Sequence, residues 1–167
     1  NGLYQITTLR KDIETDGRHA VVSFTNDFEE DSSRRDFTIN AIYSDFNGVL
    51  YDPKGGINDL RNTKIRFIGN PLDRIVEDNL RILRYFRFLA YYTSSKSNLH
   101  KESLLACSEK SDAIIKLSKE RISNEFFKLI NGKNLIFSFK LMKEINILDY
   151  IIPGLSNVLI NDIRQVK

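Results

Sequence analysis

Two stretches of the chain interleave arginines and carboxylates with apolar residues at the spacing of secondary structure. Residues 34–41 read Arg-Arg-Asp-Phe-Thr-Ile-Asn-Ala, and residues 77–84 read Glu-Asp-Asn-Leu-Arg-Ile-Leu-Arg. In the first stretch apolar residues recur at every second position, which predicts a turn that enters a strand. In the second they recur at helical spacing. An ionised carboxylate only accepts hydrogen bonds and an arginine only donates them, so both stretches could bind a ligand that offers donors and acceptors.

The second stretch places Glu77, Asp78, Arg81 and Arg84 within an arc of about 120° on the predicted helix. A pair of Asp78 and Arg81 matches the amino donor and adjacent acceptor of cytosine and of adenine. Uracil and guanine present the reverse pattern, which would cost about 1–3 kcal/mol per unpaired group. Glu77 would hold Arg81 in place. The alternative is an amphipathic helix whose solvated face carries a Glu77–Arg81 pair.

The first stretch offers groups suited to the rest of a nucleotide. The planar forks of Arg34 and Arg35 fit phosphate oxygens. Asp36 could accept from a ribose hydroxyl, and Asn40 could orient a neighbouring side chain. The alternative is a surface cluster of salt bridges that contributes little.

Composition limits the possible functions. The chain has 167 residues and a net charge of +3, which suggests an anionic partner without requiring one. One cysteine, Cys107, excludes an internal disulfide, and with two histidines it is too little for a usual zinc site. No apolar run is long enough to span a membrane, so we expect no membrane partner and a cytoplasmic location.

The chain divides near residue 70 into a strand-rich part and a helical part, which predicts the α+β class. A polar excursion, a hairpin turn and a loop are expected at residues 10–19, 45–48 and 52–60. Residues 27–33 are acidic and are expected to form a turn. Strands are predicted at residues 4–9, 20–24, 37–43, 49–51 and 64–68, and helices at residues 73–92, 101–108, 118–130 and 135–145.

Four ordered motifs carry a family resemblance: residues 34–41, residues 52–60 (Asp-Pro-Lys-Gly-Gly-Ile-Asn-Asp-Leu), residues 77–88, and Glu120-Arg121-Ile122 with Glu125. In order, they resemble the class II tRNA nucleotidyltransferase (CCA-adding enzyme) and bacterial poly(A) polymerase family over essentially the whole chain. The resemblance implies three domains: residues 1–69, the C-terminal part of a palm or head with a small mixed or antiparallel sheet; residues 70–131, a helical neck that recognises the base; and residues 132–167, the start of a helical body that touches tRNA.

The resemblance also implies a role for each motif. Residues 52–60 would be a hinge-like connector, and residues 10–19 a flexible loop that helps the switch from C to A addition. Arg34, Arg35 and Asp36 would contact triphosphate and ribose, whereas Asp78 and Arg81 would pair with the base. The full set of expected nucleotide-binding residues is Arg34, Arg35, Asp36, Asn40, Glu77, Asp78, Arg81, Arg84 and Arg87.

The expected substrates are CTP, ATP and the 3′ end of tRNA, and the expected cofactor is Mg²⁺. In the family an Asp-x-Asp strand and a glycine-rich loop, both upstream, hold the metal and phosphates. This chain contains neither, and Gln5 stands where some relatives have glutamate. We therefore assign no catalytic residue and no metal ligand, and expect a piece that is inactive without a palm half, supplied in a longer chain or by a separate polypeptide. The alternatives are a poly(A) polymerase fragment and a non-catalytic RNA-binding remnant.

Overall fold

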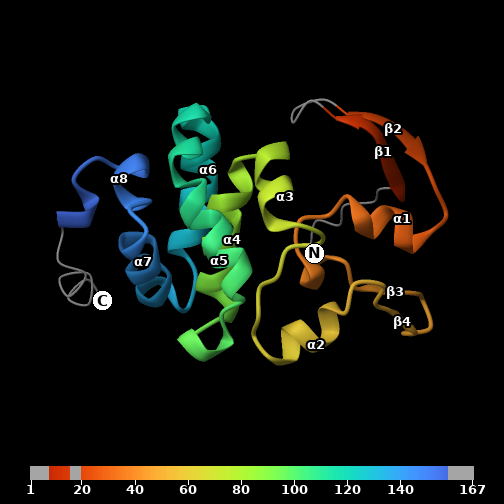
Figure 1. The fold of residues 1–167 in the computed structure, drawn as a ribbon. Helices are drawn as coiled ribbons and strands as arrows, with labels where there is room; N and C mark the ends of the chain where they lie inside the picture. Colours follow the sequence, from red (N-terminus) through yellow and green to blue (C-terminus); the bar gives the residue numbers. More distant parts are fainter. Residues whose placement is uncertain (1–7, 16–19, 158–167) are drawn as a thin grey trace, which may run out of the picture.

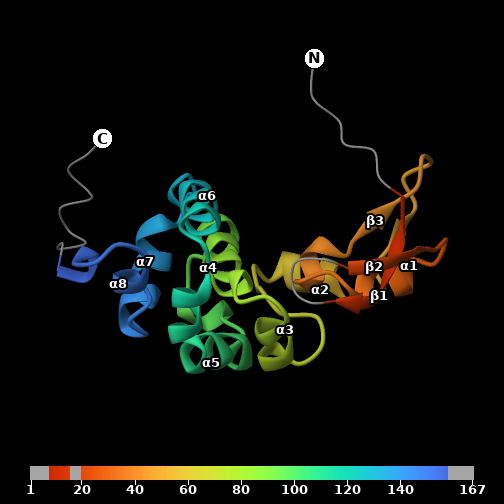
Figure 2. The ribbon, with the colours of Figure 1, turned by 90° about the horizontal axis from the view of Figure 1, so that it is seen from above.

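The computed structural model describes residues 8–15 and 20–157. A part with short strands and two small helices, red to orange in Figure 1, lies beside a larger helical part, green to blue. Figure 2 shows the same two parts side by side from above. This combination of helices with small antiparallel sheets confirms the α+β class. Among the described residues, no helix is long and apolar enough to cross a membrane.

The first sheet is an antiparallel pair of β1 (Arg10–Thr15) and β2 (Ala20–Phe24). The prediction of β2 is confirmed, whereas the interpretation of residues 10–15 as part of a loop is wrong. Residues 10–15 form a strand because β2 supplies their backbone hydrogen bonds, although their polar composition does not predict a strand. A two-stranded ribbon tolerates charged side chains on its open face. Residues 4–7 of the expected first strand and residues 16–19 of the excursion lie outside the described residues.

The acidic stretch after β2 forms α1 (Phe28–Ser33) rather than a simple turn. Asp27 caps this helix, since its carboxylate accepts from the Glu29 N–H at 2.7 Å. The acidic residues of the first turn also favour the helix through its dipole.

The predicted strand at residues 37–43 is mostly absent. Phe37 forms a single bridge with Phe67, a 3₁₀ turn η1 (Thr38–Asn40) follows, and only β3 (Tyr43–Ser44) is a strand. The predicted strand at residues 64–68 likewise reduces to this bridge. The expected hairpin is confirmed, because β3 pairs with β4 (Leu50–Tyr51) across a turn with Gly48 at φ +82°.

Residues 52–60, predicted as a loop, contain the helix α2 (Gly56–Arg61). The Asp52 carboxylate caps it by accepting from the Gly56 and Ile57 N–H groups at 2.6 and 2.9 Å. A Cβ on Gly56 would lie 2.1 Å from the Thr38 carbonyl oxygen, so only glycine allows α2 this close to η1. The motif at residues 52–60 therefore supports the motif at residues 34–41 directly.

The helical part agrees better with the sequence, since three predicted helices are confirmed with ends within one residue. The predicted helix at residues 73–92 is two helices, because Asp78 is extended (φ −152°, ψ 106°) and its carboxylate accepts from the Leu80 N–H at 3.1 Å. The described helices are α3 (Pro71–Glu77), α4 (Leu80–Tyr92), α5 (Lys101–Glu109), α6 (Lys119–Ile130), α7 (Leu135–Glu144) and α8 (Leu148–Ile151), with 3₁₀ turns η2 (Lys96–Asn98), η3 (Ser111–Lys116) and η4 (Leu155–Asn157).

An aromatic cluster joins the two parts. The Phe37 ring lies 4.8 Å from Phe67 and 5.1 Å from Phe88 on α4, and Tyr85 stacks on Phe67 at 5.8 Å. Phe37, Phe67 and Tyr85 are buried. Because these rings bury large apolar areas, they hold α4 against the motif at residues 34–41.

Candidate functional site

An open pocket of about 460 Å³ lies where the two parts meet. It is lined by Arg34, Arg35, Asp36, Asn40, Asp78, Leu80, Arg81, Arg84 and Arg121. Seven of the nine site residues expected from the sequence are in this set; Glu77 and Arg87 are not. Five arginines against two aspartates make the wall electropositive, which suits a ligand with several negative charges.

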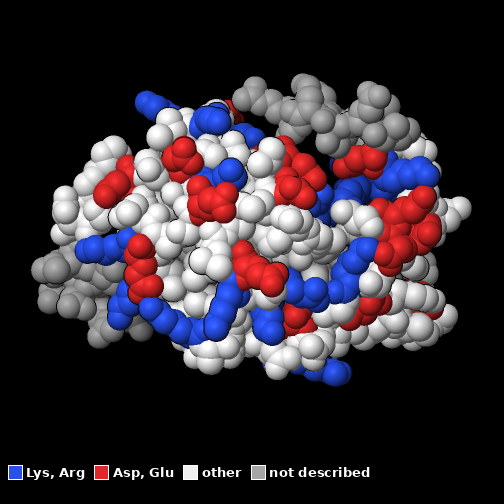
Figure 3. Space-filling model, in the orientation of Figure 1, with Lys and Arg blue, Asp and Glu red and all other residues white. Residues whose placement is uncertain are grey.

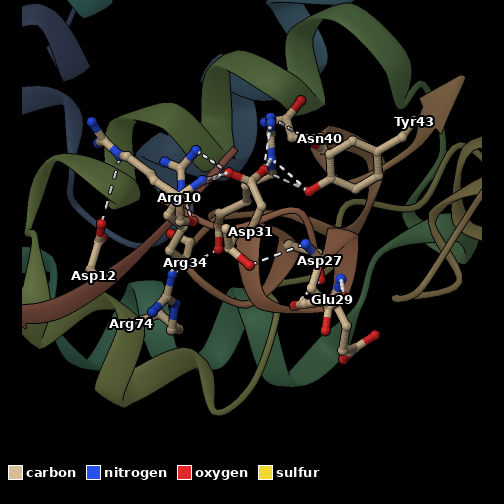
Figure 4. A network of polar contacts seen from close by, with 12 residues as sticks. Arg10, Asp12, Asp27, Glu29, Asp31, Arg34, Asn40, Tyr43 and Arg74 are labelled. Carbon is tan, nitrogen blue, oxygen red and sulfur yellow. Dashed lines mark hydrogen bonds and ion pairs between the residues drawn. The ribbon is translucent and has the colours of Figure 1, made fainter. Parts of the chain in front are cut away.

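The first two arginines are held from behind by Asp31 on α1, which is fully buried (Figure 4). Arg34 Nε donates to Asp31 Oδ1 at 3.0 Å, and Arg35 Nε donates to Oδ2 at 2.9 Å. The Tyr43 hydroxyl donates to Oδ2 at 2.8 Å, and the Arg10 N–H of β1 donates to Oδ1 at 3.1 Å. Four residues therefore satisfy one carboxylate, and β1, β3 and both arginines are tied together.

This network shifts the ionisation of its members. Burial raises the pKa of the Asp31 carboxyl, but hydrogen bonds from Arg34, the Arg10 N–H, Tyr43 and Arg35 outweigh burial and lower the pKa to about 2. Burial, with the hydrogen bond to Asp31, raises the pKa of Tyr43 to about 12. At neutral pH Asp31 is thus an anion and Tyr43 a donor.

Arg74 of α3 holds the same stretch from the helical side. Its Nη2 donates to the carbonyl oxygens of Arg34 and Arg35 at 2.8 and 2.7 Å, and its Nη1 donates to Glu77 at 2.6 Å. Burial lowers the pKa of Arg74, followed by repulsion from Arg81. The sequence interpretation missed Arg74 and Asp31. The spacing of Asp31 to Arg34 and Arg35, at i,i+3 and i,i+4, was an available signal, but it is visible only once residues 28–33 are taken as a helix.

Asp36 occupies the middle of the pocket wall and is nearly buried. Asn40 Nδ2 donates to Asp36 Oδ1 at 2.8 Å, so Asn40 does orient a neighbour. Arg84 Nε, from α4, donates to Oδ2 at 2.6 Å. The Asp36–Arg84 pair therefore links the strand-bearing part to α4 at the pocket.

The residues around the α3–α4 break form two separate ion pairs. Arg81 Nη1 donates to Glu77 at 2.6 Å and to the Arg74 carbonyl at 2.7 Å, which is the bracing expected of Glu77. Asp78 pairs with Arg121 of α6, whose Nη2 donates to both carboxylate oxygens at 3.0 and 2.9 Å. The sequence placed Arg121 in a family motif but did not assign it to the site.

Arg87 does not line this pocket, although the charges of Arg84 and Asp36, which do line it, act on Arg87. Its Nε is 2.9 Å from the buried Glu125 of α6, and it lines a smaller cavity with Phe88, Tyr91, Tyr92 and Lys128. Burial lowers the pKa of Arg87, and the Glu125 carboxylate opposes that shift. The role expected of Arg87 in nucleotide binding stays a prediction, and its direct partner in the structure is Glu125.

Among the described residues, no group of three or more His, Cys, Asp or Glu side chains could hold a metal ion. The two pocket carboxylates, Asp36 and Asp78, are each held by an arginine. The donor set described here therefore does not fit Mg²⁺.

Comparisons with known proteins identify the class of protein to which this pair of parts belongs. The family model of the poly(A) polymerase head domain matches residues 1–66. A second model, described as the probable RNA and SrmB-binding site of polymerase A, matches residues 98–159.

Curated relatives and solved structures point the same way. The mitochondrial CCA tRNA nucleotidyltransferase 1 of Homo sapiens is 42% identical over 148 residues, which is 89% of this chain and 34% of that protein. The CCA-adding enzyme of Streptococcus gordonii is 43% identical over 132 residues, covering 78% and 32%. The Bacillus stearothermophilus CCA-adding enzyme in complex with CTP superposes with a TM-score of 0.77 at 33% identity, covering 90% of this chain and 35% of that one. The Thermotoga maritima CCA-adding enzyme complexed with tRNA gives a TM-score of 0.65 at 26% identity, covering 75% and 31%.

The chain therefore belongs to the class II CCA-adding enzyme and poly(A) polymerase family, and the resemblance noted in the sequence is confirmed. It spans about a third of the length of the curated relatives it matches.

Proposed function

We propose that this chain is the nucleotide-selecting part of a template-independent RNA nucleotidyltransferase that adds C and A to the 3′ end of tRNA. One observation carries the proposal: Asp78 and Arg81 line the same pocket as Arg34, Arg35 and Asp36. The relatives named for CCA addition, and the structural neighbours holding CTP or tRNA, support these substrates. Residues 1–69 serve as head, 70–131 as neck and 132–167 as the start of the body.

The head side of the pocket binds the constant part of the nucleotide. Arg34 and Arg35 face the pocket with their guanidinium groups already held by Asp31, so little side-chain entropy is lost when phosphate binds. Asp36 accepts from a ribose hydroxyl, and Arg84 stabilises that carboxylate or meets a phosphate.

The neck side reads the base. Of the three guanidinium nitrogens of Arg81, only Nη1 has a hydrogen-bond partner among the described residues. Nε and Nη2 are therefore available to donate to the N3 of cytosine or the N1 of adenine. The Asp78 carboxylate accepts from Arg121 and from the Leu80 N–H, and it has further lone pairs for the exocyclic amino group. Uracil and guanine present a carbonyl to Asp78 and an N–H to Arg81, and are rejected.

The pocket residues do not fit Mg²⁺, so the metal expected for such an enzyme would be held by ligands outside the described residues, where it would activate the RNA 3′-hydroxyl and neutralise the triphosphate. The residues here bind and orient the nucleotide, so the chain by itself selects a nucleotide without joining it. Its cellular compartment stays a prediction, and three of the relatives are named as mitochondrial.

Selectivity is tested by measuring the binding of CTP, ATP, UTP and GTP to the chain by calorimetry. We expect CTP and ATP to bind about 5- to 100-fold more tightly than UTP and GTP, as a mismatch of 1–3 kcal/mol requires. Asp78→Ala should abolish this preference, whereas Asp73→Ala on the neighbouring helix α3 should keep it. Equal binding of all four nucleotides would overturn the proposal and favour a non-catalytic RNA-binding module.

Catalysis is tested by mixing the chain with the upstream half of a relative, Mg²⁺, CTP, ATP and tRNA lacking its 3′ end. We expect extension by the mixture and none by either half alone. Failure of the mixture beside an active full-length relative would exclude the assembled enzyme. Sequencing the products separates CCA addition from poly(A) addition.

A further inference from the structure

A second cavity, of about 270 Å³, is lined by Arg87, Phe88, Tyr91, Tyr92 and Lys128. Its residues come from α4 and α6, the helices that also contribute Arg81, Arg84 and Arg121 to the nucleotide pocket. We call Phe88, Tyr91, Tyr92 and Lys128 the aromatic ledge.

The ledge continues the nucleotide pocket along α4. Arg81, Arg84, Phe88 and Tyr91 follow one another at intervals of three or four residues, so they share one face of the helix. The Arg84 guanidinium, which lines the nucleotide pocket, lies 5.9 Å from the centre of the Phe88 ring. From Arg81 to Phe88 the helix rises roughly 10 Å, the length of about three stacked bases.

Helix α6 follows the same course. Arg121 contacts Asp78 at the nucleotide pocket, and Glu125 pairs with Arg87 one turn further. The Tyr91 hydroxyl then donates to the Lys128 carbonyl at 3.1 Å. These contacts run in the same direction on both helices, so the ledge lies at the end of α4 and α6 away from the nucleotide pocket, along the same pair of helices.

The tyrosines of the ledge are not part of the core. Tyr91 and Tyr92 remain 39% and 43% exposed, although Phe88 beneath them packs on the buried Phe37. The Phe88 and Tyr92 rings are stacked, 6.1 Å apart and 13° from parallel. Tyr92 stacks on Phe88, and Tyr91 lies beside Tyr92 with ring centres 6.4 Å apart, so two half-exposed rings offer apolar surface for stacking.

Charge at the ledge suits a phosphate backbone. Arg87 and Lys128 share the single carboxylate of the buried Glu125, at 2.9 and 3.8 Å, which leaves one excess positive charge; the Lys128 side chain is exposed. On the face drawn in Figure 3, both basic and acidic side chains are spread over the surface. Aromatic rings beside an exposed cation are the combination by which proteins hold single-stranded nucleic acid.

We propose that the aromatic ledge binds the single-stranded 3′ end of the RNA substrate by stacking its last bases on Tyr91 and Tyr92, with Lys128 on a phosphate. This inference rests on the proposed function, because it gives the RNA end a place on the same pair of helices as the incoming nucleotide. Stacking tolerates any base, so the ledge holds the growing end as its last nucleotide changes. A duplex, whose base faces are covered, does not bind this way.

The test measures binding of a fluorescent single-stranded RNA ending in CC to the chain, by anisotropy and without nucleotide. We expect Tyr92→Ala and Tyr91→Ala each to weaken binding about 5- to 100-fold, as the loss of one stacked base predicts. Tyr92→Phe should restore binding. Lys128→Gln should reduce the slope of affinity against salt by about one phosphate contact. Phe46→Ala, at a fully exposed aromatic on the β3–β4 turn, is the matched control and should change nothing.

Circular dichroism melting establishes that the variants are folded. Folded Tyr91→Ala and Tyr92→Ala chains that bind RNA within twofold of the unsubstituted chain would overturn the inference, as would no RNA binding at all or equal binding of a blunt duplex. Nucleotide selectivity is measured on the same proteins. If the chain prefers CTP and ATP but the tyrosine variants bind RNA as the unsubstituted chain does, only the proposed RNA site is rejected. If the chain shows no nucleotide preference but the tyrosine variants lose RNA binding, only the proposed nucleotide selection is rejected.

Discussion

Of the aspartates that hold arginines of the arginine-lined pocket, Asp31 and Asp78 differ most clearly in burial. Asp31, behind Arg34 and Arg35, is 0% exposed and accepts from four residues. The side chains of Asp78 and Arg121 are 24% and 33% exposed. Within the described part of the chain, they are each other's ion-pair partners, and Asp78 also accepts from the Leu80 N–H. Both are pairs of an aspartate with arginine, but of the two carboxylates only that of Asp78 is accessible to water.

The difference separates a fixed wall from an adjustable one. When a buried carboxylate loses a partner, an unpaired charge remains in the interior. Losing one partner of Asp31 should therefore strongly lower the free energy of unfolding. A partly exposed pair such as Asp78–Arg121 gains less from its own contact, because water can replace a lost partner, so it can exchange partners at smaller cost. The wall proposed to meet phosphate and ribose is thus preformed, and the wall proposed to read the base can rearrange.

Removing Asp31 should have the largest effect. In Asp31→Ala, Arg34 and Arg35 lose their shared carboxylate and β1 loses its link through Arg10, so the free energy of unfolding should fall by about 3 kcal/mol. Urea unfolding followed by circular dichroism measures it. Glu144→Gln, which breaks only the exposed pair with Lys96, is the control and should be near neutral. If Asp31→Ala and Glu144→Gln lowered the free energy of unfolding by similar amounts, the buried network around Asp31 would contribute no more than an exposed ion pair.

Acid should weaken the head side specifically. The folded pKa of Asp31 is about 2, below the usual value near 3.9, so the unfolded chain binds more protons between those pH values. The stabilisation is therefore complete above about pH 4 and is lost as the pH falls through about 2, amounting to about 2.5 kcal/mol. The raised pKa of Tyr43, about 12, has the opposite sign: its contribution is present below pH 10 and lost as the pH rises through 12.

Urea unfolding of the unsubstituted chain at a series of pH values tests this, with Asp31→Asn as the comparison. The variant should show a flatter acid limb, because its residue 31 has no proton to bind. An unchanged acid limb in Asp31→Asn would assign the acid sensitivity to other carboxylates.

Breaking the partly exposed pair of Asp78 and Arg121 should affect binding more than stability. Arg121→Gln should cost less than about 1 kcal/mol of unfolding free energy, since the pair with Asp78 is open to water. The preference for CTP and ATP should change in the same variant, because Asp78 loses the group that orients it. The two measurements are urea unfolding and nucleotide titration. A stability loss as large as that of Asp31→Ala would remove the contrast between the two walls.

Glu77→Gln should have the smallest effect. Glu77 is partly exposed and holds Arg81 and Arg74 by single oxygens, so the loss should be a few tenths of a kcal/mol. Affinity for CTP should fall about two- to fivefold, because Arg81 keeps its bond to the Arg74 carbonyl and stays near its position. Calorimetric titration beside Asp73→Ala detects this difference. Unchanged CTP affinity would show that the carbonyl alone positions Arg81.

Prediction from the sequence worked where the signal was local. The helices α5, α6 and α7 follow apolar residues at helical spacing, and the hairpin follows Asn47 and Gly48, so nearest neighbours in the sequence are sufficient. It failed at residues 10–15 and 37–43, because a strand needs a partner strand. Residues 10–15 found one despite their charge, and residues 37–43 found only the single bridge from Phe37 to Phe67.

The sequence by itself determined the family, the helical part and most of the pocket's residue types, because those depend on motifs and short-range periodicity. Only the tertiary structure decided which groups hold the pocket in shape. Asp31 meets the Arg10 backbone 21 residues away, and Asp78 meets Arg121 43 residues away, at the break that ends α3. Partners so distant are brought together by the packing of β1, α4 and α6, and hydrogen bonds between them leave no period in the sequence.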